Sequence, residues 1–334
     1  MGGMDLEFAL AAEKAINDLE CNGSLDAISA LSDPVERDAL LTALVPVYAS
    51  RSANVRALIR DIFAQHESSA GAPTPPAGYR TLWTEKFADL SNWDVYGPGN
   101  KETWGQQAPQ NRSGFYGYAG LNAGPKGLDM TVTPDPAGRQ AKSGRPGWST
   151  QFIVPKPTLP CPLYARYEVE GRFDRLPGFW PALLWMTLNP GGSDVVELDV
   201  HEWFGNDPTS VRQATHMRRN GTASVDYNVG PAILGLNQRT PIRDDGFHRY
   251  AVTVHPDGAG HVRFAYEFDG HATYGFSTRD LVAKGSPHDD WVKTALGWSL
   301  KICTQAEGQS GFFPAGFKGP ASLHVNWVQV SVPT

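Results

Sequence analysis

The chain has 334 residues, of which 19% are charged and 11% aromatic, with 35 Gly, 26 Pro and 10 Trp. This composition argues against a disordered chain and favours a turn-rich β protein, organised as one large domain or two unequal ones. The net charge of -6, without a basic block, argues against a nucleic-acid partner, and no apolar run approaches the ~20 residues of a membrane span.

The first part of the chain, residues 1–66, is predicted to be a small helical region that serves assembly or anchoring. Apolar residues recur with helical spacing between residues 55 and 63, as Val55, Leu58, Ile59, Ile62 and Phe63. Three short helices are expected, with breaks near residues 22–24, 31–34 and 50–53. A region this small gains stability from a partner, so a homo-oligomeric or virion assembly through it is one interpretation.

The start of the chain does not read as a secretory signal peptide, because it lacks a positive start and an uninterrupted apolar stretch. The chain is then expected in a virion or released by lysis, and otherwise in the cytoplasm. Residues 67–80 combine Ser, Ala and Gly with a Pro cluster and are predicted to be a linker.

Residues 81–334 are predicted to form one antiparallel β-sandwich. Apolar residues alternate with polar ones at a period of two, for example over residues 262–268, and Gly, Pro, Asn and Asp separate the runs. In the last expected strand, residues 323–332, the apolar parity shifts between Trp327 and Val328, which indicates a bulge or burial on both faces.

The three cysteines, Cys21, Cys161 and Cys303, have no metal-ligand spacing. Buried free thiols are favoured over a disulfide between Cys161 and Cys303.

The segment that carries chemistry is the expected strand from Val195 to Glu202. On a regular strand Val196, Leu198 and Val200 share the apolar face, while Glu197, Asp199 and His201 share the other. Placing two acids this close on one face is unfavourable unless they have a function, because each raises the pKa of the other.

Glu202 has the wrong parity for the acidic face. A one-residue bulge after Asp199 would return it to that face, so that three carboxylates line one cleft. Same-face neighbours lie ~7 Å apart, which lets the two glutamates converge on one glycosidic bond. Glu197 is then predicted to attack the anomeric carbon, Glu202 to act as acid and then base, and Asp199 to set their protonation.

Two other interpretations of the acidic pattern remain open. The spacing Glu-x-Asp-x-x-Glu is short and common, and exposed strand faces often carry acids. An acidic pair can also bind a cation.

The sequence resembles glycoside hydrolase family 16, the group of laminarinases, lichenases and agarases. That family has its acidic motif after a Gly-x-Trp-Pro-Ala segment, and here Gly178-Phe-Trp-Pro-Ala182 precedes Glu197-Leu-Asp-Val-His-Glu202. The resemblance extends over most of residues 82–332, including Tyr164-Ala-Arg-Tyr-Glu168 and the Asp-Gly pair that ends at Gly270.

The resemblance implies a concanavalin A-like jelly roll and retaining, endo-type hydrolysis of a β-linked glucan or galactan. It gives Glu197 as nucleophile, Asp199 as its helper and Glu202 as acid/base. It also places Trp180, Trp185 and His216 among the cleft-lining residues, with core packing as the alternative for each. Trp104, Trp203 and Trp298 are expected to be structural.

The sequence departs from the family at several points. Glu170 stands where the family has Arg, and Asn326 stands where many members have an Asp that binds a structural calcium. No cofactor is therefore expected, with a structural calcium as the alternative. The helical region 1–66 has no counterpart in the family's catalytic domain, which suits a bacteriophage tail component that degrades host-surface glycan. A non-catalytic sugar-binding module or a structural virion protein on the same scaffold is the competing interpretation.

Overall fold

A computed structural model describes residues 74–95, 113–141, 144–188, 195–207, 209–218, 226–228, 239–242, 245–258, 260–279 and 297–334. The predicted helical region 1–66 lies outside these residues, and so does the predicted linker up to residue 73. The first strand, β1, begins at Tyr79, at the end of the predicted linker. The described part contains no helix long and apolar enough to cross a membrane.

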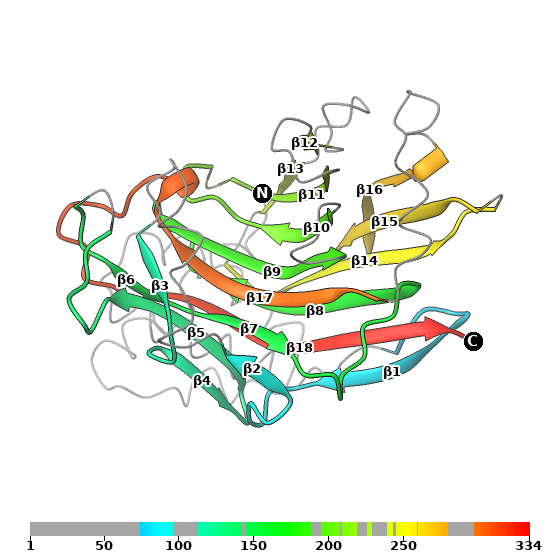
Figure 1. Cartoon of the computed structure of the whole chain (residues 1–334), viewed down its shortest axis with the longest axis horizontal. Helices are drawn as coiled ribbons and strands as arrows, with labels where there is room; N and C mark the ends of the chain where they lie inside the picture. The colour runs from blue at the N-terminus through cyan, green and yellow to red at the C-terminus, as the bar shows by residue number, and fades with distance from the viewer. Residues whose placement is uncertain are drawn as a thin grey trace, which may run out of the picture. The chain divides into compact units, whose positions relative to one another are not determined.

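The predicted β-sandwich is confirmed, because the described residues form two sheets that pack face to face and are antiparallel except for the pair of β3 and β6 (Figure 1). The first sheet contains, in spatial order, β16 (His271–Ser277), β15 (Val262–Phe268), β14 (His248–Pro256), β8 (Ala165–Phe173), β18 (Ala321–Pro333), β5 (Gly127–Pro134), β6 (Trp148–Thr150) and β3 (Gly114–Tyr116). Two further strands flank this order, β1 (Tyr79–Glu85) against β18 and β4 (Leu121–Gly124) against β5.

The second sheet presents one face to the first and the other away from it. Its spatial order is β12 (Asp226–Asn228), β11 (Ser210–Arg218), β10 (Val195–Glu202), β9 (Phe179–Leu188), β17 (Ser299–Ala306), β7 (Phe152–Pro155) and β2 (Trp93–Val95), with β13 (Arg239–Pro241) against β11. A short 3₁₀ helix, η2 (Gly308–Ser310), follows β17.

The core lies between the two sheets and is built by the alternation seen in the sequence. Tyr167 and Val169 of β8 point inward from the first sheet, and Met186 of β9 and Leu198 of β10 do so from the second. All four side chains are fully buried. Burial of a large apolar side chain contributes about 1.5–3 kcal/mol, so this inner layer holds the sheets together.

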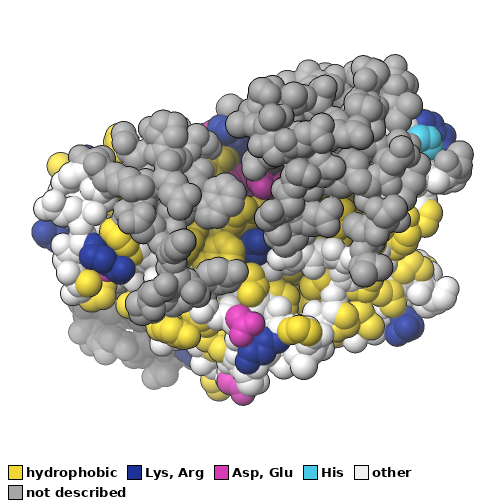
Figure 2. All heavy atoms as spheres, viewed as in Figure 1, with side chains coloured by type: hydrophobic (Ala, Val, Ile, Leu, Met, Phe, Trp, Pro, Cys, Tyr) yellow, Lys and Arg dark blue, Asp and Glu magenta, His cyan; other side chains and the backbone are white. Residues whose placement is uncertain are grey.

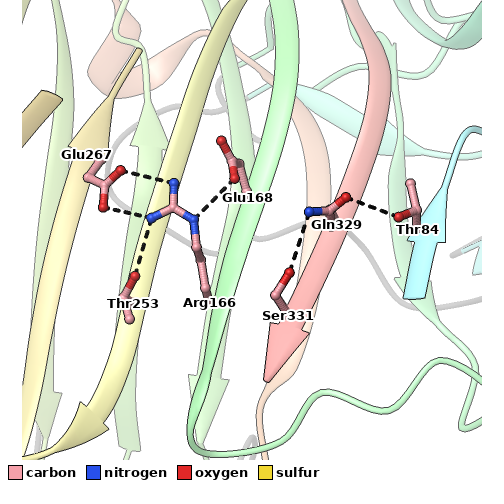
Figure 3. A network of polar contacts seen from close by, with 7 residues as sticks. All are labelled: Thr84, Arg166, Glu168, Thr253, Glu267, Gln329 and Ser331. Atoms are coloured by element: carbon pink, nitrogen blue, oxygen red, sulfur yellow. Dashed lines mark hydrogen bonds and ion pairs between the residues drawn. The ribbon is translucent and has the colours of Figure 1, made fainter. Parts of the chain in front are cut away.

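The first sheet carries a polar network on the face turned away from the core (Figure 3). The Arg166 guanidinium donates to both Glu267 carboxylate oxygens, at 2.7 and 2.9 Å, and to Glu168 Oε2 at 3.1 Å. Gln329 Nε2 donates to Ser331 Oγ at 3.4 Å on the neighbouring strand β18. Because Arg166 and Glu168 are buried, each charge depends on the other for compensation.

The predicted irregularity in the last strand is a β-bulge. The pairing of β18 with β8 shifts register between Val325 and Trp327, just before the parity change in the sequence. The Asp-Gly pair of the sequence also forms a tight turn, since Asp269 and Gly270 both have positive φ, 50° and 77°, between β15 and β16.

No disulfide joins Cys161 and Cys303, and Cys303 is buried, as the sequence predicts; Cys21 lies outside the described residues. Burial raises the pKa of the Cys161 thiol to about 12, so this thiol stays protonated at neutral pH.

Candidate active site

Strand β10 divides its side chains between the core and the open face of the second sheet. Val196, Leu198 and Val200 are fully buried in the core. Glu197 and Asp199 alternate with them and therefore lie on the opposite face, as predicted.

The bulge predicted after Asp199 is present. Asp199 pairs with Ala214 of β11 and Glu202 pairs with Arg212, so three steps along β10 match two along β11. The extra residue returns Glu202 to the face that carries Glu197 and Asp199.

The same bulge turns His201 inward, so the expectation that it shares the acidic face is wrong. Its ring centre lies 4.9 Å from that of Phe173 and 4.4 Å from that of Tyr250. The side chain is fully buried, and this burial lowers its pKa to about 3.

Strand β9 is also irregular, at the residues that pair with the bulge of β10. Leu184 adopts a left-handed φ of 54°, which is unfavourable for a leucine, while β9 stays paired with β10 on both sides of it. Asp199 pairs with Trp185 and Glu202 with Ala182, so both strands advance three residues together. The matched bulges keep the two strands aligned where the acids lie.

Trp180 and Trp185 lie on the acidic face of the sheet rather than between the sheets. The Trp180 indole N–H donates to Glu202 Oε1 at 3.0 Å, and the register sets Trp185 beside Asp199. Their side chains are only 4% and 9% exposed, so neither offers an open ring face. A role in substrate binding remains a prediction for both.

The other tryptophans and His216 lie in different places. Trp203 and Trp298 are buried in the core, as predicted, and Trp104 lies outside the described residues. The backbone of β11 pairs His216 directly with Glu197, which puts it on the strand next to the acids. Its predicted role in the cleft is not tested by this placement.

Figure 2 shows hydrophobic side chains gathered on the viewed face of the molecule, with acidic side chains visible beside them. Among the residues that the structure describes, no three His, Cys, Asp or Glu side chains are arranged to hold a metal ion.

The sequence of residues 161–274 matches the profile of glycosyl hydrolases family 16. This span runs from just before β8 into β16 and includes the whole acidic strand. The resemblance to glycoside hydrolase family 16 is confirmed.

Solved structures support the fold of this family. The catalytic domain of an endo-1,3-β-glucanase from Thermotoga petrophila is 16% identical, with a TM-score of 0.57 over 77% of this chain and 98% of that chain. SCLam, a non-specific endo-β-1,3(4)-glucanase from family 16, is 22% identical, with a TM-score of 0.58 over 81% and 99%. An endo-1,3-β-glucanase from Pyrococcus furiosus is 16% identical, with a TM-score of 0.57 over 77% and 95%. No curated protein matches the sequence.

The two departures from the family 16 pattern contact each other. Glu170 Oε2 accepts from Asn326 Nδ2 at 3.2 Å and from the Trp327 indole at 3.1 Å. Burial raises the pKa of the Glu170 carboxyl, and these two donors oppose that rise. Asn326 is thus part of a protein hydrogen-bond network. The expectation of no cofactor, with a structural calcium as the alternative, stays a prediction.

Sequence reasoning missed two cations on the acidic face. Arg212 of β11 pairs with Glu202, and its guanidinium stacks 4.5 Å from the centre of the Phe204 ring. Lys301 of β17 pairs with Trp185 on the other side of the acids. Lys301 occupies a polar position in the otherwise apolar run Leu300–Cys303, and that alternation is the sequence signal that could have revealed it.

Proposed function

We propose that this chain is a retaining, endo-acting glycoside hydrolase that cleaves a β-linked glucan or galactan. The observation that carries the proposal is the register shift between Asp199 and Glu202, because it brings a third carboxylate to the open face of the sheet. Without the shift, Glu202 would point into the core and the site would lack one of its two glutamates.

The proposed roles follow from the positions of the three acids. Glu197 attacks the anomeric carbon, and Glu202 first protonates the leaving oxygen and then activates water. Negative charge on Glu197 and Asp199 favours the protonated form of Glu202 that the first step needs. The indole N–H of Trp180 holds the orientation of the Glu202 carboxyl.

Asp199 is proposed to assist from between the two glutamates. Its side chain is buried on the acidic face, between the strand positions of Glu197 and Glu202. There it can hydrogen-bond either glutamate and hold the two in the geometry that a double displacement requires.

The substrate class rests on the described neighbours and on the site. The structures similar to this chain include endo-1,3-β-glucanases, and a variant of SCLam holds 1,3-β-D-cellobiosyl-glucose at its active site. A β-linked glucan is therefore the first substrate to test, with galactans next.

The test is incubation of the full chain with laminarin, lichenan, agarose, carrageenan and a bacterial wall arabinogalactan, followed by product analysis. Glu197→Gln and Glu202→Gln should each lower the release of reducing ends by at least a thousandfold with unchanged melting temperature. Asp94→Asn, an exposed acid on strand β2 of the same sheet, is the control and should retain full activity. Unchanged turnover in the Glu197→Gln variant refutes the assignment.

Retention has its own measurement. Proton NMR of the first products should show the β anomer before mutarotation, and azide should restore activity to Glu197→Gly through a glycosyl azide. Release of the α anomer would indicate inversion instead. Binding of a glycan without any cleavage would support the alternative of a sugar-binding module.

We also propose that the enzyme works in a virion, as a phage tail component, or is released by lysis. This proposal rests on the sequence of residues 1–66, which lies outside the described structure. It predicts that the full chain forms a defined oligomer in analytical ultracentrifugation. A monomer at all concentrations would contradict it.

A further inference from the structure

Lys301 is a buried cation on the same sheet face as the three acids. It lies on β17 and pairs with Trp185 of β9, which in turn pairs with Asp199 of β10. These three side chains therefore form one row across the sheet. The lysine is only 8% exposed, so its charge acts within the protein rather than in solvent.

The hydrogen bonds of Lys301 connect it to the cross-strand partner of the proposed nucleophile, Glu197. Its Nζ donates to Thr187 Oγ1 at 2.5 Å and to the Ser299 carbonyl at 3.2 Å. Since an ammonium group has only donors, the Thr187 hydroxyl accepts this bond and keeps its own proton to donate. Thr187 is the direct cross-strand partner of Glu197.

The charge of Lys301 also interacts with the acids Glu197 and Asp199 of β10. Its Nζ contacts a side chain of β9, which lies one strand spacing, about 4.8 Å, from β10. The Nζ also lies 5.0 Å from the centre of the Trp185 ring, which shields it from water.

The described titratable groups around Lys301 are few. Glu197 and Asp199 face it from β10, the Cys303 thiol from β17, and Asp94 from β2 beyond the apolar strand β7. Burial lowers the pKa of Lys301 to about 8, and among its neighbours Glu197 opposes this most strongly. At neutral pH the ammonium is therefore mainly charged, and it interacts chiefly with Glu197.

We propose that Lys301 is a positioning residue that holds Glu197 as an ionised, correctly oriented carboxylate, through its own charge and through the Thr187 hydroxyl. The inference rests on the proposed function, because it assigns Glu197 as the nucleophile. It adds a cation that the reaction needs but that touches no substrate.

Activity against pH tests this role in the full chain. Lys301→Met should lower kcat at least tenfold with KM within twofold, and the acidic limb of the kcat profile should move up by about one pH unit. Lys301→Arg keeps the charge and should restore the acidic limb. Thr187→Val should lower kcat without moving the limb, since the charge remains.

The control is Lys156→Met, because Lys156 is a half-buried lysine away from the acids whose Nζ bonds only to the Ser91 carbonyl among the described contacts. It should leave kcat, KM and the profile unchanged. A Lys301→Met profile that coincides with the wild-type profile overturns the inference, even when Glu197→Gln abolishes activity. In that case the proposed function still stands.

A second measurement does not depend on turnover. In protein labelled with ¹³C at the glutamate carboxyls, the Glu197 signal is assigned from its loss in Glu197→Gln. Its titration midpoint should be about one pH unit higher in Lys301→Met than in the wild type. Equal midpoints refute the inference whether or not any polysaccharide is cleaved, and a shifted midpoint in an inactive chain refutes the function alone.

Discussion

Substitution of His201 by phenylalanine should stabilise the sandwich, and the gain should grow as the pH falls. His201 is enclosed between the rings of Phe173 and Tyr250, and its two ring nitrogens have no hydrogen-bond partner among the described residues. Each buried polar atom without a partner costs about 1–3 kcal/mol, whereas phenylalanine has a similar shape and no polar atom. Overpacking by the larger ring offsets about 1 kcal/mol of this gain.

The pH dependence follows from the depressed pKa. His201 has a pKa of about 3 in the folded chain, against the ordinary histidine value of 6.5, because burial disfavours the imidazolium. Between these values the unfolded chain binds a proton that the folded chain does not. Stability is therefore lost as the pH falls below about 6.5, by about 2 kcal/mol at pH 5. The phenylalanine variant lacks this loss.

The assay is urea unfolding of the full chain, followed by tryptophan fluorescence, at pH 8, 7, 6 and 5. The difference in free energy of unfolding between His201→Phe and wild type should be about 1–5 kcal/mol at pH 8 and about 2 kcal/mol larger at pH 5. His271→Phe, at the exposed first position of β16, is the matched control and should show no such trend. A difference that stays constant from pH 8 to pH 5 would refute the placement of a neutral histidine in the core.

Two further substitutions test what stabilises the sandwich. Gly178→Ala should destabilise the chain by more than about 2 kcal/mol, because φ is +86° and the new Cβ would lie 2.3 Å from a backbone nitrogen. The control Gly138→Ala, at φ +65° with open space around it, should cost about 1 kcal/mol in the same urea assay. Arg166→Met should cost about 3–5 kcal/mol, because it leaves Glu168 and Glu267 without their buried partner. Its control, the double variant that also carries Glu168→Gln, should recover part of this loss, and equal stability of both variants would contradict the ion-pair account.

The fold was predictable because its alternation is strong and local. In strand β8 the residues Tyr167 and Val169 face the core while Arg166 and Glu168 face away, so the period of two is visible in the sequence. The bulge in β10 was predictable for a different reason. Only an extra residue brings Glu202 back to the side of the other acids.

The rest of the site could not be predicted because it depends on pairing between distant strands. Nothing in the residue type of Leu184 indicates a left-handed conformation, since leucine disfavours it. The conformation belongs to the pairing of distant strands, because β9 has one residue more than β17 between the pairs Trp185–Lys301 and Ala182–Cys303. Lys301 comes more than a hundred residues after Asp199 in the chain, yet β9 is the only strand between them. Its contact with Thr187 follows from the order of strands in the sheet, which local periodicity does not report.

The paired irregularities of β9 and β10 have a consequence for engineering and for sequence change. An insertion or deletion in either strand alone would slip the indole of Trp180 along the sheet relative to the carboxyl of Glu202, although both residues were retained. The acidic strand therefore cannot be transplanted by itself. A graft of this chemistry onto another sandwich must carry residues 179–202 as one block, including the leucine in its unusual conformation.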